Sequence, residues 1–215
     1  MRALAMHGIL LLAAGAAAGW LSPQEIMDRI VARVENNVIL LSDVRALARY
    51  QLLLDGQAES DAQILDRLID QWIVRTEADA AHFPHPSEAD TDRALARVRN
   101  SFASGEEYEA RKRQAGLSEQ DVRAMVSSQL YLSNYLDSRF RPAVRIDPKE
   151  VEDFYHTAVV PRAQARGQAP PSLEAAREAI QEALIENGIS RQADQWLTES
   201  RPRLHIEKSL DEVAK

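Results

Sequence analysis

Residues 28–44, DRIVARVENNVILLSDV, decide the fold of this chain. The segment is typical of a small β-hairpin that runs directly into a capped helix. Asn36-Asn37 marks the expected turn, because asparagine tolerates the positive φ angles that a tight hairpin turn requires. The remaining sequence is mainly helical in pattern, so this hairpin is its most distinctive feature.

An apolar leader precedes the hairpin. Arg2 supplies a positive charge, residues 8–18 are apolar, and Ala16-Ala17-Ala18 offers the small side chains that a signal peptidase needs. The apolar run is shorter than the roughly 20 residues that span a bilayer, which favours cleavage near Ala18 over a retained anchor. Trp20 and Leu21 keep the anchor as an alternative. We therefore expect residues 1–18 to be a signal peptide and the mature protein to be exported without stable membrane insertion.

Composition narrows the class of protein and its partners. The chain has no cysteine, so an exported form would rely on packing for stability and not on disulfides. The absence of cysteine after the leader also excludes a lipoprotein anchor. Its 33 acidic residues outnumber 26 lysines and arginines, which argues against nucleic acid and anionic membrane surfaces as partners. The length suits one helical core, alone or with a small satellite.

Helical patterns dominate the chain after the hairpin. Apolar residues recur in pairs every four positions from Ile64 to Ile73, which predicts one buried stripe on a helix over about 61–81. Ser60 and Gln63 form a plausible capping box in front of it. Comparable start signals and periodicity predict further helices over about 87–102, 106–115, 118–140, 147–155 and 172–199. The sequence thus predicts a mainly α fold.

The expected helix after Ser118 carries aromatic residues on two sides. Val122, Val126 and Leu136 lie in one arc together with Met125, Gln129, Ser133 and Phe140, whereas Tyr131 and Tyr135 point the other way. Two tyrosines on that side indicate either packing against another helix or an exposed contact surface. Burial against another helix is the favoured interpretation.

The chain changes character after residue 155. Residues 156–171 contain three prolines and a glycine, which predicts a linker or loose loop. A helix follows over about 172–199, and residues 204–207 alternate like a short strand. Residues 209–215 are expected to be a frayed tail.

Four segments in this order resemble the SurA-type periplasmic chaperones, relatives of the PrsA and PpiD foldases. They are the hairpin DRIVARVENNVILLSDV, the helix ILDRLIDQWIVRTEADA, the entry VRIDPKEVEDFY and the closing IQEALIENGISRQADQWLTESRPRLHIE. The resemblance covers nearly the whole mature chain and implies a periplasmic location. It also implies that residues 19–155 form an N-terminal helical chaperone region and that residues 172–208 complete its core. Residues 203–207 would then pair with the hairpin at 29–40.

The chain departs from this family in one respect. The better-known members carry one or two parvulin prolyl-isomerase domains before the final helix. Here only the sixteen residues 156–171 occupy that place, and an independent domain needs at least about 50. The resemblance therefore implies a chaperone core without an isomerase.

Such a core would hold unfolded polypeptides by weak and reversible contacts with apolar and aromatic surface. The resemblance implies that the clients are outer-membrane β-barrel proteins, whose alternating strands aggregate when exposed. The candidate client-binding residues are Tyr131, Tyr135, Phe154 and Tyr155, each of which could instead belong to the core. This function needs no nucleophile, metal or cofactor.

Catalytic motifs are scarce in the sequence. His82 and His85 lie in a proline-rich loop without a placed carboxylate or cysteine, which does not favour a metal site. No G-x-S-x-G elbow and no glycine-rich phosphate loop occurs. We therefore expect no enzyme activity, metal or cofactor. Two alternatives to a holdase stay open: a prolyl isomerase, disfavoured by length, and an assembly subunit whose Tyr131 and Tyr135 surface binds one folded partner.

Overall fold

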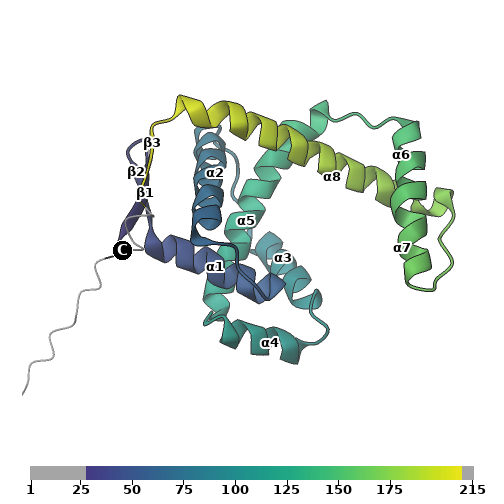
Figure 1. Cartoon of the computed structure of the whole chain (residues 1–215), viewed down its shortest axis with the longest axis horizontal. Helices are drawn as coiled ribbons and strands as arrows, with labels where there is room; N and C mark the ends of the chain where they lie inside the picture. The colour runs from purple at the N-terminus through teal and green to yellow at the C-terminus, as the bar shows by residue number, and fades with distance from the viewer. Residues whose placement is uncertain (1–27, 210–215) are drawn as a thin grey trace, which may run out of the picture.

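The computed structural model describes residues 28–209, which form a mainly helical fold with a small antiparallel sheet at one end (Figure 1). This confirms the mainly α fold class with a small hairpin completed by a C-terminal strand. The expected signal peptide and residues 19–27 lie outside the described residues, as do residues 210–215 of the expected tail. Within residues 28–209, no helix combines the length and apolar character needed to cross a membrane.

The sheet joins the two ends of the described chain. Strands β1 (Ile30–Val34), β2 (Asn37–Leu40) and β3 (Ile206–Lys208) lie in the order β2-β1-β3, and both neighbours of β1 are antiparallel to it. The predicted hairpin and the predicted return of the C-terminal strand to it are both confirmed. Ser209, which the sequence placed in the tail, still belongs to this pairing, because its N–H donates to the Val31 carbonyl over 2.9 Å.

The hairpin turn differs from the prediction. The positive φ angle, 52°, falls on Glu35, and Asn37 is already the first residue of β2. The third strand explains why Glu35 adopts this conformation. The Glu35 N–H donates to the His205 carbonyl over 2.9 Å, and the Glu35 carboxylate accepts the His205 N–H over 2.7 Å. These two hydrogen bonds hold the turn and the C-terminal strand together.

Five helices build the body of the protein. Their bounds are α1 (Leu41–Asp55), α2 (Asp61–Ala80), α3 (Glu88–Asn100), α4 (Gly105–Gln114) and α5 (Glu119–Phe140). The start signals read from the sequence are confirmed, since Ser60, Ser87, Ser104 and Ser118 each accept a backbone N–H of the first helical turn. One continuous cluster of buried apolar residues joins the sheet to these helices.

Helix α5 buries a different face from the one predicted. Val122 and Val126 are buried as expected, but further along the helix Tyr131 and Tyr135 are buried while Ser133 is exposed. The two halves of α5 pack in different clusters: the first half joins the main core, and the second packs against α2. A single apolar arc therefore does not describe the whole helix.

Residues 148–172 form a projecting unit that we call the arm. It comprises α6 (Pro148–Phe154), a π-helical turn (Tyr155–Val159), α7 (Val160–Ala165) and the loop that returns to α8. The prediction of a loose linker over 156–171 is therefore wrong as far as Ala165. The π-helical turn, in which the Val160 N–H donates to the Tyr155 carbonyl, lets the helix continue past Pro161, a residue with no N–H to donate.

Helix α8 (Leu173–Ser200) runs from the arm across the body to the sheet (Figure 1). Its end is fastened to α2, because the Arg201 Nε donates to Asp70 over 2.7 Å and Arg201 and Lys208 both contact Asp66. Near its middle, α8 passes very close to the segment that follows α5. A Cβ atom at Gly188 would lie 2.6 Å from Cγ1 of Val144.

The contact at Gly188 gives a test of this crossing. In an open helix interior, Gly→Ala stabilises by about 1 kcal/mol. We expect Gly188→Ala to do the opposite and lower the free energy of unfolding by about 1–3 kcal/mol, because the added methyl group overlaps Val144. Urea unfolding measures the change. The double variant Gly188→Ala/Val144→Ala is the control and should recover most of the loss, whereas a stabilised single variant would contradict the crossing.

The loop between α1 and α2 gives a pH test. Hydrogen bonds from Arg67, and from Gln51, lower the pKa of Glu59 to about 2. Because this pKa lies below the ordinary value of 4.5, the stabilisation is complete above about pH 4.5 and is lost as the pH falls towards 2. Urea unfolding between pH 2 and pH 7 should therefore show a steeper acid loss for the wild type than for Glu59→Gln. Parallel pH curves would contradict the assignment.

Candidate functional site

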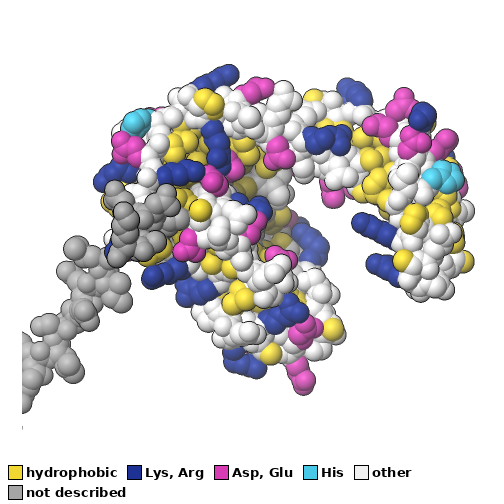
Figure 2. Space-filling view, viewed as in Figure 1, with side chains coloured by type: hydrophobic (Ala, Val, Ile, Leu, Met, Phe, Trp, Pro, Cys, Tyr) yellow, Lys and Arg dark blue, Asp and Glu magenta, His cyan; other side chains and the backbone are white. Residues whose placement is uncertain are grey.

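The arm lies at the first end of α8, opposite the sheet, and is separate from the body (Figure 1). It packs on α8, and Figure 2 shows an open hollow between the arm and the lower helices of the body. The body, α8 and the arm thus give the molecule the outline of a hook (Figure 1). The arm forms the outer wall of this hollow.

The arm has only a small core, which it shares with α8. Three residues are buried there: Val151 of α6 and Ala176 and Ile180 of α8. Around them, apolar side chains are only partly covered, and these are Ile146, Phe154, Tyr155, Val159, Leu173 and Leu184. The Tyr155 hydroxyl donates to the Pro171 carbonyl over 2.7 Å and ties the return loop to the helix. The apolar and aromatic side chains of the arm are therefore partly exposed to solvent.

The end of the arm also differs in charge from the rest of the chain. Residues 155–171 contain no aspartate or glutamate, although the whole chain has a net charge of −7. Arg162 and Arg166 are exposed in this stretch. In Figure 2, basic side chains project from the lower arm towards the hollow. The end of the arm thus combines partly exposed apolar groups with positive charge.

Tyr131 and Tyr135 lie inside the body. They are 2% and 5% exposed and pack with Val74 and Ala78 of α2. The Tyr131 hydroxyl donates to Asp79 over 2.7 Å, and its ring stacks on His85 with the ring centres 4.2 Å apart. Burial, together with the bond to Asp79, raises the pKa of Tyr131 to about 12. Burial, the interpretation that the sequence favoured, is confirmed, and an exposed tyrosine surface is wrong.

The four candidate client-binding residues therefore do not form one site. Tyr131 and Tyr135 belong to the interior of the body, whereas Phe154 and Tyr155 lie half-buried on the arm. Only the arm pair is accessible in this structure. Sequence analysis did not single out Val159 beside them, because the prolines of residues 156–171 concealed the helical continuation. It also did not single out Leu173, the first residue of the next helix.

Two of the open pockets along α8 lie near its middle. One, of about 460 Å³, lies between α5 and α8 and has Leu136, Ile189 and Ala193 among its lining residues. The other, of about 480 Å³, lies between residues 143–145 and α8, close to the base of the arm. Neither pocket could be predicted from the sequence, because each brings together residues that are far apart along the chain.

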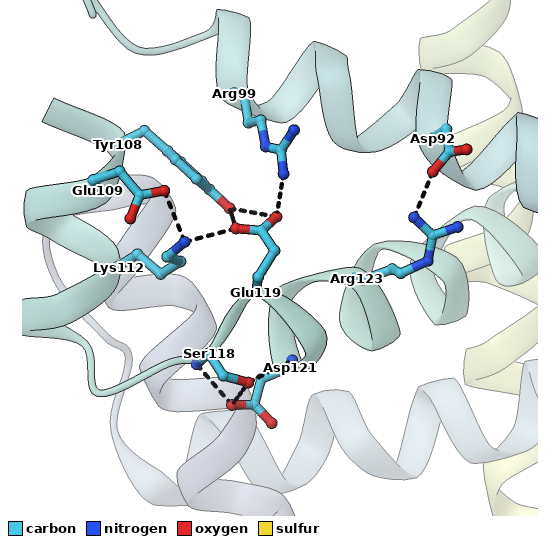
Figure 3. A network of polar contacts seen from close by, with 9 residues as sticks. All are labelled: Asp92, Arg99, Tyr108, Glu109, Lys112, Ser118, Glu119, Asp121 and Arg123. Carbon is cyan, nitrogen blue, oxygen red and sulfur yellow. Dashed lines mark hydrogen bonds and ion pairs between the residues drawn. The ribbon is translucent and has the colours of Figure 1, made fainter. Parts of the chain in front are cut away.

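Besides the arm and the pockets, the third candidate site is a polar network that connects α4 to α3 and α5 (Figure 3). Glu119 accepts hydrogen bonds from Lys112 over 2.6 Å, from Arg99 over 2.6 Å and from the Tyr108 hydroxyl over 3.2 Å. Lys112 is only 8% exposed and also contacts Glu109. Burial acts to lower the pKa of Lys112, but the hydrogen bonds to Glu109 and Glu119 outweigh burial and raise this pKa.

The network of Figure 3 serves to hold helices together. Burial, together with the negative charge of Glu119, raises the pKa of Tyr108, so both Tyr108 and Lys112 stay protonated well above neutral pH. Every polar group named here already has a partner within the network. This arrangement adds to the apolar packing of α4, whose buried residues are Lys112 and Tyr108, the latter a member of the main core.

Comparison with known proteins adds no family assignment. No protein-family model matches the chain, and no curated protein matches it. The likeness to SurA-type chaperones accordingly stands on the four sequence segments alone.

The placement of the aromatic residues gives a test that separates the interior from the arm. We expect Tyr131→Ala to lower the free energy of unfolding by about 3–5 kcal/mol, because it leaves a cavity in a packed cluster. Tyr155→Ala should cost about 1 kcal/mol, since it removes one hydrogen bond and partly exposed packing. Urea unfolding of both variants, with Tyr131→Phe as a milder companion, measures the difference. Equal losses for the two alanine variants would contradict the assignment.

Proposed function

We propose that this protein is an exported holdase-type chaperone that binds unfolded outer-membrane β-barrel proteins in the periplasm, without isomerase activity and without a cofactor. The observation that carries the proposal is the arm, with partly exposed apolar residues beside an open hollow. An unfolded β-barrel strand offers alternating apolar side chains that suit such a surface. The four family-like segments of the sequence support the same assignment.

A small contact with the partly covered apolar residues of the arm would give weak and reversible binding. If a client segment covers about 100–200 Å² of apolar surface on the arm, the hydrophobic contribution is about 2.5–5 kcal/mol before the cost of ordering the segment. A holdase needs this range, because a client that bound much more tightly would not be released to fold. Several such contacts along one client would add avidity.

The two alternatives have less support. The place where family members carry an isomerase domain is occupied here by the π-helical turn and α7, which are part of a continuous helix. The surface proposed for a single folded partner relied on Tyr131 and Tyr135, and both residues are buried. The holdase therefore agrees best with the arrangement of the residues.

Light scattering tests the proposal. An unfolded outer-membrane β-barrel protein is diluted into buffer with the purified mature chain, and we expect suppression of aggregation at near-stoichiometric ratios. The double variant Phe154→Ser/Tyr155→Ser should reduce this suppression at least several-fold, because it removes partly exposed aromatic surface from the arm. The prolyl cis-trans rate of a test peptide should stay at its uncatalysed value.

A matched control is available on the sheet. Val38 is 42% exposed on β2, far from the arm, and Val38→Ser removes apolar surface there. This variant should suppress aggregation as well as the wild type does. Equal activity of the arm variant and the wild type would contradict the role of the arm, and no suppression by the wild type would contradict the holdase itself.

A further inference from the structure

The pocket at the base of the arm has an unusual lining. Residues 143–145, which lead from α5 towards α6, form one wall, and α8 forms the other. The lining residues are Ala143, Val144, Arg145, Gly188, Arg191, Gln192 and Gln195. They include two arginines and two glutamines but no aspartate or glutamate, in a chain whose acidic residues outnumber lysine and arginine by 33 to 26.

The two arginines of this pocket are not neutralised by carboxylates. Within residues 28–209, Arg191 makes no side-chain hydrogen bond or ion pair, and Arg145 donates only to the carbonyls of Pro142, over 2.7 Å, and Val144, over 3.3 Å. Nearby Arg141 is different, because Asp137 and Glu182 both bind it. The carbonyl contacts orient Arg145 and leave its positive charge uncompensated.

We propose that this pocket binds a carboxylate of the client polypeptide, either the C-terminal carboxylate or an acidic side chain. Guanidinium groups bind carboxylates through paired hydrogen bonds. Gln192 supplies an amide that can donate to and accept from peptide groups, and Val144 gives an apolar wall for the neighbouring side chain. A pocket of about 480 Å³ is larger than one small inorganic anion needs, which favours a peptide.

The position of the pocket connects it to the arm. Arg145 lies three residues before α6 begins, and the α8 residues of the pocket follow those that pack on the arm. A polypeptide that extends from the arm along α8 would therefore reach the pocket. The inference rests on the proposed holdase function and adds a chemical preference to it. Apolar contacts on the arm would hold many unfolded chains, and the arginine pocket would favour those that present a carboxylate.

Fluorescence anisotropy tests the preference with three labelled peptides of one apolar sequence. The first has a free C-terminus, the second an amidated C-terminus, and the third an amidated C-terminus with one internal glutamate. We expect the amidated peptide without glutamate to bind at least 5-fold more weakly than the best carboxylate peptide. The first and third peptides distinguish the C-terminal carboxylate from the acidic side chain.

Substitutions assign the preference to the pocket. Arg191→Gln and Arg145→Gln should each remove most of the difference between the peptides, since each deletes one guanidinium and keeps a polar side chain. Arg113→Gln, at an exposed position on α4, changes the net charge equally and should leave the difference intact. Circular dichroism and urea unfolding confirm that each variant is folded before binding is measured.

Three results would overturn the inference. Equal affinity for all three peptides would exclude a carboxylate preference, and an equal effect of Arg113→Gln would assign it to overall charge. Displacement of the carboxylate peptides by millimolar inorganic phosphate would indicate a general anion site. The light-scattering assay separates this failure from failure of the holdase, because a chain that suppresses aggregation without preferring carboxylates refutes the pocket alone.

Discussion

The pairing of β3 with β1 is the constraint on which the rest of the structure depends. It joins the C-terminal strand to the N-terminal hairpin, and hydrogen bonds between Glu35 and His205 close that junction at the turn. Arg201 adds a second attachment by binding two aspartates of α2. Because both ends of the described chain meet at the sheet, the 28 residues of α8 must run the length of the molecule. The arm therefore stands at the end opposite the sheet.

The body and the arm, which α8 connects, differ in how much apolar packing they contain. The body has a continuous core that includes the sheet and all five of its helices, and the close passage of Val144 past Gly188 fits α8 against the segment that follows α5. The arm relies on three buried residues and a ring of partly covered ones. Regions with few buried apolar contacts open at lower free energy than the core of the same protein. We infer that the arm adapts to a bound chain more readily than the body does.

Local signals in the sequence predicted much of the fold, because caps and periodicity act over a few residues. Ser60, Ser87 and Ser118 start helices as expected, and the hairpin and its third strand are present. The predictions failed where distant segments decide the outcome. His205 places the positive φ angle on Glu35, and packing against α2 buries the tyrosines of α5.

The arm and the arginine pocket also could not be predicted from local sequence signals. A π-helical turn lets the helix of the arm continue past Pro161. From the sequence alone this continuation is not expected, because a proline more often ends a helix. Arg145 and Arg191 are 46 positions apart and share no motif, so only the fold brings them to one pocket. A glycine in the interior of a long helix, as at position 188, is the one sequence signal that could have indicated the close crossing nearby.

Hydrogen exchange with and without an unfolded outer-membrane β-barrel protein tests the central claim, that the arm binds the client, most directly. We expect the client to slow exchange in residues 148–172 and in the adjoining first half of α8. Exchange in the sheet and in α1–α4 should stay unchanged. Protection confined to the sheet or the body, with none in the arm, would show that the arm does not bind the client.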